Sequence, residues 1–319
     1  MGFHLRFYLA LCRSDLMILA RLVLLCLLVQ APVVEALEPG PEGSIVEQTT
    51  VEKIYRGVVF AEVDDIQLSL DVYLPKKKGS RPHLVVFFHG GSWRSGSKES
   101  CQVRWLVRHG YAVASVGYRK SHAAKFPVIL HDCKGAIRFL RARADALGFQ
   151  AERVAVAGAS AGGHLALLLA TTGGVEELEG SVGGHLEYSS RVQLGLGMYS
   201  PTDLHHDAIT APDRWDKPAS SLFQLLGGKP SEKVALVRKA SVTSHITSDD
   251  PPVLFLVGGA DQPERIEHGK RLKAAYDKAG LQAVLQIIPG AGHGGPEFRD
   301  EQRAALILEM LDEELAGRP

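Results

Sequence analysis

The chain has 319 residues, of which 45% are apolar and 23% are charged, the composition of a globular protein with a sizeable core. That composition excludes an intrinsically disordered or collagen-like chain. The 36 basic and 36 acidic residues cancel to a formal charge of zero, so nucleic acid is not an expected partner. The 33 glycines indicate many tight turns, and we predict one large α/β domain.

Residues 1–36 have the features of a secretory signal peptide. Basic residues precede the apolar run Leu22–Val29, and Val34-Glu35-Ala36 supplies the small side chains that signal peptidase selects. We expect cleavage after Ala36, a folded domain over 37–319, and a secreted or periplasmic location. The apolar run is too short for a stable membrane span. Either Met1 or Met17 could be the start residue, because a chain beginning at Met17 matches the signal-peptide pattern more closely.

The mature chain begins with two predicted strands, 51–60 and 67–74, that form an antiparallel pair. From residue 83 onward, strands and helices alternate. Apolar runs at 84–88, 112–116 and 154–157 have no polar alternation, which is typical of parallel strands buried on both faces. The predicted helices between these strands are 98–109 and 127–147, the second ending at Gly148.

The alternation continues to the C-terminus. It predicts strands at 192–198, 253–257 and 284–288, and helices at 163–171, 265–279 and 296–316. These strands and the earlier five make an eight-stranded, mostly parallel sheet, with helices expected on both faces. The polar segment 204–250 contains helical pieces and no clear strand, so we predict that it forms a small lid.

Gly158-Ala159-Ser160-Ala161-Gly162 fits the G-x-S-x-G motif, in which a serine occupies a sharp turn between a strand and a helix. Here the motif follows the predicted strand 154–157 and opens the predicted helix 163–171. The small neighbouring residues let the strand and the helix approach closely while the serine hydroxyl points outward. The alternative, a glycine-rich turn with an incidental serine, does not explain this context. We therefore predict Ser160 as a nucleophile.

A serine nucleophile needs a base and a group that orients the base. Asp261 follows the strand 253–257 and His293 follows the strand 284–288, in the chain order that this architecture requires. We predict His293 as the base and Asp261 as the orienting carboxylate. Asp203, after the strand 192–198, is a rival acid. The pair Asp249-Asp250 is a weaker alternative, since it precedes a strand.

The loop His89-Gly90-Gly91-Ser92-Trp93 follows the buried strand 84–88, where N–H groups that bind an oxyanion are expected. The predicted oxyanion hole comprises Gly90, Gly91 and Ser92 with Ala161, and Gly91 and Ala161 are the favoured donors. His89 and Trp93 are predicted to bind substrate, with Trp93 on the acyl side. The alternative for Trp93 is simple packing.

We predict no metal site and no cofactor. His205-His206-Asp207 is the one candidate cluster, but neighbouring side chains of this kind are typical of a solvated loop. No pair of cysteines has the spacing of a zinc site. His164 and Asp132 are interpreted as structural residues.

Four segments together resemble the α/β-hydrolase esterases of the BD-FAE-like group, relatives of the hormone-sensitive-lipase-like esterases and of kynurenine formamidase. They are Phe87–Trp93, Gly158–His164, Val257–Asp261 and Gly290–Gly294. The resemblance covers roughly residues 50–312 and implies the α/β-hydrolase fold. Ser92 replaces the third glycine of the HGGG motif, which favours the BD-FAE-like branch, whose members include carboxylesterases, acetyl-xylan esterases and feruloyl esterases.

The strand order that this resemblance implies also bears on Cys101 and Cys133, the two cysteines beyond the signal peptide. Their crossovers run in opposite directions across the sheet. Because each crossover is right-handed, the two helices cover opposite faces. Although export permits oxidation, we expect both thiols to remain unpaired, since a disulfide requires Cα atoms within about 7 Å.

The sequence therefore predicts an exported serine carboxylesterase for short acyl esters, with acetyl or feruloyl esters of plant polysaccharide as candidate substrates. An arylformamidase is the first alternative, favoured by the HGG-x-W motif and disfavoured by export. A non-catalytic hydrolase-like binding protein is the second alternative, disfavoured because the serine, the histidine and the acid are all present. The oligomeric state is left open.

Overall fold

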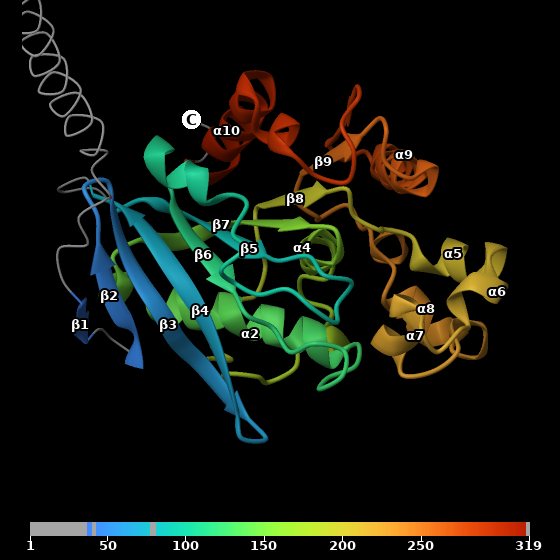
Figure 1. Ribbon diagram of the computed structural model, residues 1–319, viewed down its shortest axis with the longest axis horizontal. Helices are drawn as coiled ribbons and strands as arrows, with labels where there is room; N and C mark the ends of the chain where they lie inside the picture. The colour runs from blue at the N-terminus through green and yellow to red at the C-terminus, as the bar shows by residue number, and fades with distance from the viewer. Residues whose placement is uncertain (1–36, 40–42, 77–80, 317–319) are drawn as a thin grey trace, which may run out of the picture.

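The computed structural model describes residues 37–39, 43–76 and 81–316, so the predicted signal peptide lies outside the described residues. The described strands form one ten-stranded sheet in the order β1-β2-β3-β4-β6-β5-β7-β8-β9-β10 (Figure 1). The strands are β1 (Leu37–Pro39), β2 (Ile45–Gln48), β3 (Glu52–Val63), β4 (Ile66–Pro75), β5 (His83–Phe88), β6 (Ala112–Val116), β7 (Gln150–Ala159), β8 (Leu194–Met198), β9 (Val253–Gly258) and β10 (Ala283–Ile288).

Strands β3 to β10 are the eight strands predicted from the sequence, and their sheet is mostly parallel. Strand β4 runs antiparallel to β3 and β6, whereas the neighbours from β6 to β10 pair in parallel. The prediction missed β1 and β2, which extend the sheet beyond β3 as short antiparallel strands. Strand β2 has four residues, too few for alternation to distinguish it from a loop.

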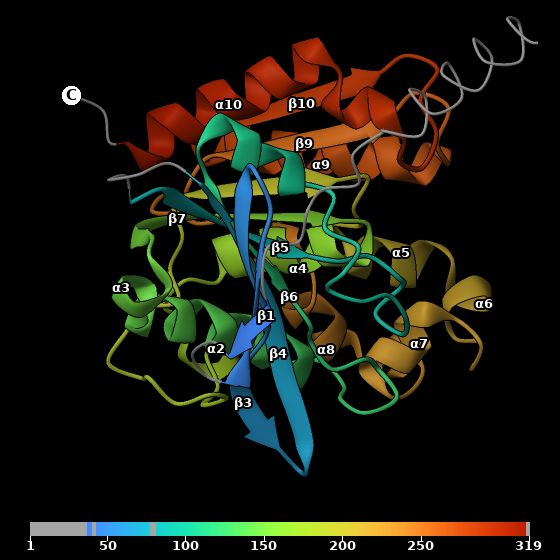
Figure 2. The same cartoon turned by 60° about the vertical axis from the view of Figure 1, so that its left-hand side comes forward.

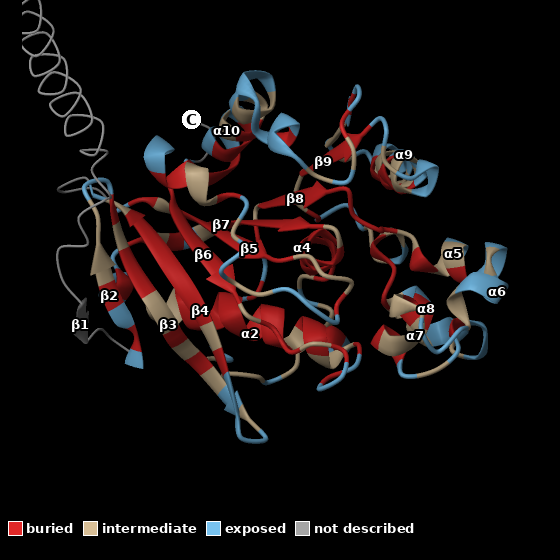
Figure 3. Ribbon diagram, in the orientation of Figure 1, coloured by how far each residue is buried: buried red, intermediate tan, exposed pale blue. Residues whose placement is uncertain are grey.

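Helices cover both faces of the sheet, as predicted (Figure 2). One face carries α2 (Val128–Ala142), α4 (Ala161–Thr171) and α9 (Pro263–Lys278). The other carries the 3₁₀ helix η2 (Arg104–His109) and α10 (Glu301–Leu315). Alternate side chains of β5 enter the two layers, Val86 and Phe88 on the first face and Val85 and Phe87 on the second. The central strands are therefore buried on both sides (Figure 3).

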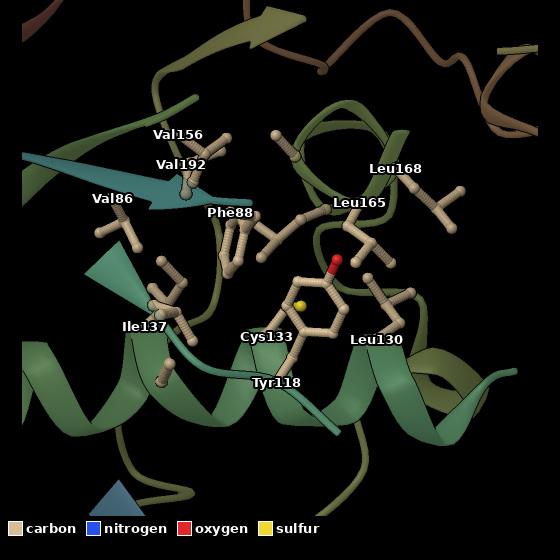
Figure 4. Close-up of a cluster of buried hydrophobic side chains, with 14 of the residues drawn as sticks. Val86, Phe88, Tyr118, Leu130, Cys133, Ile137, Val156, Leu165, Leu168 and Val192 are labelled. Atoms are coloured by element: carbon tan, nitrogen blue, oxygen red, sulfur yellow. The ribbon is translucent and has the colours of Figure 1, made fainter. Parts of the chain in front are cut away.

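The opposite-face placement of the two cysteines is confirmed. Cys133 on α2 is buried in the first layer, where it lies with Phe88, Tyr118 and Leu165 (Figure 4). Cys101 packs against the second layer on the other side of the sheet. Both are free thiols in the structure. Because the sheet separates them, no rotamer change brings the two sulfur atoms together.

The predicted helix 98–109 is wrong in its first half, because within this range only η2 (Arg104–His109) is helical. The Ser115 hydroxyl donates to the carbonyl oxygen of Lys98 at 2.6 Å, and the Lys98 ammonium lies 3.0 Å from Asp71. The Lys98 carbonyl oxygen, which would accept a hydrogen bond within a helix, and the Lys98 ammonium, which would face solvent, are therefore both engaged by neighbouring strands. The predicted helix 127–147 divides into α2 and α3 (Ala144–Leu147), and it ends at Gly148 in the left-handed conformation, as expected.

The predicted lid segment 204–250 is an insertion of short helices between β8 and β9, and its movement stays a prediction. It lies to one side of the sheet in both views (Figures 1 and 2). Its helices are α5 (Leu204–Thr210), α6 (Pro212–Trp215), α7 (Ser221–Leu226), η4 (Pro230–Glu232), α8 (Val234–Lys239) and η5 (Val242–Ser244). Outside it, η3 (Glu176–Leu178) follows α4 and η6 (Pro296–Arg299) precedes α10. None of the described helices combines the length and the apolar character needed to cross a bilayer.

Candidate active site

Ser160 lies at the turn between β7 and α4, with backbone angles φ 53° and ψ −119°. A non-glycine residue in this region stores about 1–3 kcal/mol of strain, which the surrounding contacts must offset. One such contact is the hydrogen bond from the Ser160 N–H to the carbonyl oxygen of Met198, at 2.8 Å. The turn directs the hydroxyl away from the core, toward the carboxyl edge of the parallel strands.

Glycine is required around this turn because main-chain atoms approach too closely for a side chain. A Cβ atom on Gly158 would lie 2.2 Å from the carbonyl oxygen of Gly162. A Cβ atom on Gly162 would lie 2.0 Å from the carbonyl oxygen of Phe88, on the neighbouring strand β5. The two outer glycines of the motif therefore let β7, β5 and the first turn of α4 meet at the serine.

The structure brings Ser160, His293 and Asp261 into hydrogen-bond contact. His293 Nδ1 is 2.7 Å from Asp261 Oδ2, and His293 Nε2 is 3.2 Å from Ser160 Oγ. The side chain of Asp261 is 3% exposed, whereas that of His293 is 44% exposed. A buried carboxylate on Nδ1 requires the proton at that nitrogen, which leaves Nε2 as the acceptor facing the serine hydroxyl.

The rival acids are engaged elsewhere. Asp203 caps α5 by accepting from the His206 N–H at 3.0 Å, and its other oxygen lies 3.2 Å from Arg271. Asp249 forms an ion pair with Arg191 at 2.9 Å. Asp250 accepts from the Thr247 N–H at 2.8 Å. Of the candidate acids, Asp261 is the one that contacts His293.

The loop after β5 lies against the serine turn. A Cβ atom on Gly90 would lie 2.9 Å from the carbonyl oxygen of Ala159 and 3.4 Å from Ser160 Cβ. The loop turns sharply, with φ 118° at Gly91 and φ 54° at Ser92. Ala161 is the first residue of α4, where N–H groups have no acceptor within the helix. The residues predicted to form the oxyanion hole thus surround Ser160.

His89 is 1% exposed and lies beneath this loop. Its ring stacks on Tyr118 with centroids 4.4 Å apart, and Nδ1 contacts the carbonyl oxygen of Gly90 at 2.7 Å. Burial lowers the pKa of His89 to about 4, so the ring is neutral at pH 7. The ring supports the loop from below, and its predicted contact with substrate stays a prediction.

Trp93 is 4% exposed and forms a buried pair with His164 of α4. Trp93 Nε1 donates to His164 Nδ1 at 3.2 Å, and the rings meet edge to face with centroids 5.2 Å apart. His164 Nε2 lies 2.7 Å from the carbonyl oxygen of Ala240, to which it donates. His164 therefore links the loop after β5, helix α4 and the insertion, the structural role expected for it. Asp132 is also structural, since it is buried in an ion pair with Arg119.

Two cavities meet at Ser160 and differ in size and lining. The larger, about 440 Å³, is lined by the loop that follows β5 together with Ser100, Gln102, Tyr199 and His293. The smaller, about 20 Å³, lies on the other side of the serine. Its lining includes Trp93, Ala161, Leu204, Trp215, Leu222 and Arg265, but His293 is absent from it.

Two residues of these cavities were missed by the sequence analysis. The Tyr199 ring lies 4.5 Å from the His293 ring, between centroids, and its hydroxyl donates to Gln102 at 2.8 Å. Tyr199 directly follows strand β8, so its position at the carboxyl edge was a usable signal. Arg265 carries no such signal, because it lies inside α9 and only the approach of the insertion brings it to the cavity.

The histidine cluster considered for a metal is divided among different partners. His205 accepts from Arg238 at 3.1 Å, and Asp207 lies 3.2 Å from His268. Within the part of the chain that the structure describes, no three His, Cys, Asp or Glu side chains converge on a common point.

The sheet order and the serine turn define an α/β-hydrolase fold. Residues 70–276 match the BD-FAE family, and the chain belongs to this family.

Several of the similar proteins are ester hydrolases by name. The chain is 28% identical over 240 residues to esterase LipC of Mycobacterium tuberculosis, an alignment that covers 72% of this chain and 58% of that protein. It is 26% identical over 239 residues to the ethyl acetate hydrolase of Pseudomonas putida, covering 72% and 70%. A solved structure, a truncated carbohydrate esterase from gut microbiota, has 28% identity and a TM-score of 0.77, covering 84% and 98%. The chain thus spans little more than half the length of the mycobacterial esterase.

Proposed function

We propose that the protein is an exported serine carboxylesterase that hydrolyses esters of short acyl groups. The observation that carries the proposal is the contact of Ser160, His293 and Asp261 on a strained turn at the carboxyl edge of the sheet. A serine hydroxyl becomes a nucleophile when a neutral imidazole removes its proton and a carboxylate holds that imidazole in place. Membership of the BD-FAE family and the esterase relatives support the same chemistry.

In this mechanism Ser160 Oγ attacks the ester carbonyl while His293 Nε2 takes the hydroxyl proton. Asp261 keeps the other ring proton on Nδ1 and stabilises the imidazolium that forms. His293 then returns the proton to the departing alcohol, and water repeats the sequence to release the acid and regenerate Ser160. The ground-state Oγ to Nε2 distance of 3.2 Å is within reach of this transfer.

The negative charge that develops on the carbonyl oxygen needs donors that are already in place. We assign this role to the N–H groups of Gly91 and Ala161, with Ser92 as an alternative within the loop. Each such donor typically contributes about 3–4 kcal/mol to the transition state. Gly90 allows the loop to lie close enough, since a side chain there would contact Ala159 and Ser160.

The position of His293 decides which cavity receives which part of the ester. The alcohol must leave beside the imidazole that protonates it, and His293 lines the larger cavity. The acyl group then occupies the smaller cavity, beside Trp93 and Ala161. Its volume of about 20 Å³ is near the minimum that one water molecule requires, which favours an acetyl group.

The relatives are consistent with an acetyl ester of a carbohydrate as the substrate. One acts on ethyl acetate by its name, and the neighbouring structure is a carbohydrate esterase. The open alcohol cavity, about 440 Å³, leaves room for a sugar residue. Export, expected from residues 1–36, would bring the enzyme to extracellular polysaccharide.

Ser160→Ala tests the mechanism with p-nitrophenyl acetate as substrate. We expect kcat/KM to fall by at least about 10⁴-fold with no change in the folded circular dichroism spectrum, because the hydroxyl contributes to attack and not to the core. Phenylmethylsulfonyl fluoride should add its sulfonyl group to the wild type and not to the variant, as read by mass spectrometry. Ser181→Ala, at an exposed serine outside both cavities, should keep its activity.

Retention of activity by folded Ser160→Ala would refute the mechanism. Substrate preference is a separate measurement, made with acetylated xylan, methyl ferulate and N-formylkynurenine. Preference for N-formylkynurenine would replace the esterase assignment by the arylformamidase one. Complete inactivity of the wild type on all of these would favour a non-catalytic binding protein.

A further inference from the structure

Arg265 is a charged side chain that has no partner among the described residues and lies at the edge of the proposed acyl cavity. It lies in the first turn of α9 and lines both the small cavity at Ser160 and a second cavity of about 230 Å³ between α9 and helices α5 and α6. Within the described ranges, the guanidinium forms no hydrogen bond and no ion pair. The side chain is half-buried, so its charge is partly removed from water without compensation.

The carboxylates nearest to Arg265 are committed to other groups. Asp261 accepts from His293 at 2.7 Å. Asp207 lies 3.2 Å from His268 and 3.7 Å from Arg271. Both attract the Arg265 charge, yet burial is the larger effect and lowers the pKa of the guanidinium. The group stays protonated at neutral pH, since its ordinary pKa is above 12.

The other two arginines of the second cavity do have partners. Arg214 forms an ion pair with Glu264 at 3.1 Å, and Arg271 forms one with Asp203 at 3.2 Å. Arg265 is therefore the guanidinium available to an incoming anion within the described part of this cavity. Its planar N–H groups suit a carboxylate, which can accept two parallel hydrogen bonds.

Arg265 lies where the two cavities meet. The small cavity and the second cavity share Asp207, Trp215 and Arg265 in their linings. A two-carbon acyl group fills the small cavity, so a longer acyl chain would extend toward the residues that the two cavities share. An anionic group at the far end of such a chain would reach the guanidinium without displacing a protein ligand.

We propose that Arg265 binds a carboxylate at the distal end of the acyl group, so that the enzyme also hydrolyses half-esters of short dicarboxylic acids. This inference rests on the proposed function. With a succinyl half-ester, Ser160 takes the succinyl group, the alcohol leaves with the proton from His293, and water releases succinate. The acyl carboxylate stays ionised throughout and takes no part in bond making.

Two methyl esters of matched shape test the proposal. Monomethyl succinate carries the distal carboxylate, and methyl 4-methylpentanoate carries a neutral isopropyl group in its place. Methanol release is measured for the wild type, Arg265→Met and Arg265→Lys. Lys270→Met removes a positive charge from the same helix at an exposed pair with Glu267, and it serves as the control for net charge. Methyl acetate reports the basal esterase activity.

Loss of one charge-assisted, two-point contact corresponds to about 10- to 100-fold in kcat/KM. We expect the ratio of kcat/KM on monomethyl succinate to kcat/KM on methyl 4-methylpentanoate to fall by that factor in Arg265→Met. Because Arg265 lines the acyl cavity, this ratio is the readout, and not the activity on methyl acetate. Arg265→Lys should recover part of the loss, because it keeps the charge and loses the paired geometry. Lys270→Met should match the wild type on all three.

Several outcomes would overturn the proposal. Equal losses of Arg265→Met on monomethyl succinate and methyl 4-methylpentanoate would mean that Arg265 shapes the acyl cavity and does not bind the carboxylate. Failure of the wild type on monomethyl succinate alone would remove this inference and leave the esterase assignment intact. Failure on every ester, methyl acetate included, would instead remove the proposed function.

Discussion

The buried contact between Trp93 and His164 makes the stability of the protein depend on pH. His164 is fully buried and accepts from Trp93 Nε1 at Nδ1 while Nε2 donates to the carbonyl oxygen of Ala240. Protonation would place a hydrogen on Nδ1, facing the indole N–H, so that the acceptor is lost and a charge is buried. Burial accordingly lowers the pKa of His164 from 6.5 to about 4.

The sign and size of the effect follow from linkage between protonation and folding. Below pH 6.5 the unfolded chain binds a proton at His164, whereas the folded chain does not until the pH nears 4. The unfolded state therefore binds more protons in this window, and the free energy of unfolding falls as the pH falls. For these pKa values the loss from His164 is about 1 kcal/mol at pH 6 and about 2 kcal/mol at pH 5.

His164→Gln isolates this contribution, because an amide supplies an acceptor and a donor and does not titrate. We expect the wild type to lose about 2 kcal/mol more than the variant between pH 7 and pH 5. Guanidinium chloride unfolding at several pH values measures the free energy of unfolding of the wild type and of the variant. Titratable groups that the two proteins share, His89 included, contribute equally to both pH dependences, so the difference between them reports His164 alone. Parallel pH dependences would show that His164 is not kept neutral by burial and would refute the reasoning.

The remaining predictions concern the acid, the metal and the thiols. Asp261→Asn should lower kcat on p-nitrophenyl acetate by about 10⁴-fold, as when the orienting carboxylate of such a site is removed; Asp203→Asn should stay within about tenfold of the wild type, and a larger loss for Asp203→Asn would transfer the role. EDTA should leave hydrolysis unchanged, because serine attack uses a proton acceptor and no Lewis acid; inactivation reversed by a divalent metal would contradict this. Thiol titration of the unfolded, unreduced protein should find Cys101 and Cys133 both free, and a monomer with neither thiol would mean that the two cysteines do not lie on opposite faces of the sheet.

Much of the site could be predicted from the sequence because its parts follow strands. Buried parallel strands are continuous apolar runs, and the residues after them meet at one edge of the sheet. Ser160, Asp261 and His293 were identified on that basis, and the structure places them within hydrogen-bond distance. The glycines of the serine turn have a local cause of the same kind, since strand and helix meet there in few residues.

The choice between competing residues needed tertiary contacts. Asp203 and Asp261 both follow strands. Asp203 is engaged elsewhere, because it forms an ion pair with Arg271, a residue of a helix that is distant in the sequence. The first half of the predicted helix 98–109 fails because Ser115 and Asp71 bind Lys98 from neighbouring strands. Local helix propensity does not include such partners, because they come from segments that are distant in the sequence.

By itself, the sequence determined the class of fold, the succession of the eight main strands along the chain, the serine turn and the pair Ser160 and His293, and it favoured Asp261 over Asp203. These features depend on hydrophobic period, on turn chemistry and on chain order, all of which are local. Only the tertiary structure decided that His89 is buried under its loop, that His164 joins Trp93 to the insertion, and that Arg265 faces a cavity with no partner in the described part of the chain. Burial and the approach of distant segments set these properties, because desolvation and pairing depend on every element that packs around a group.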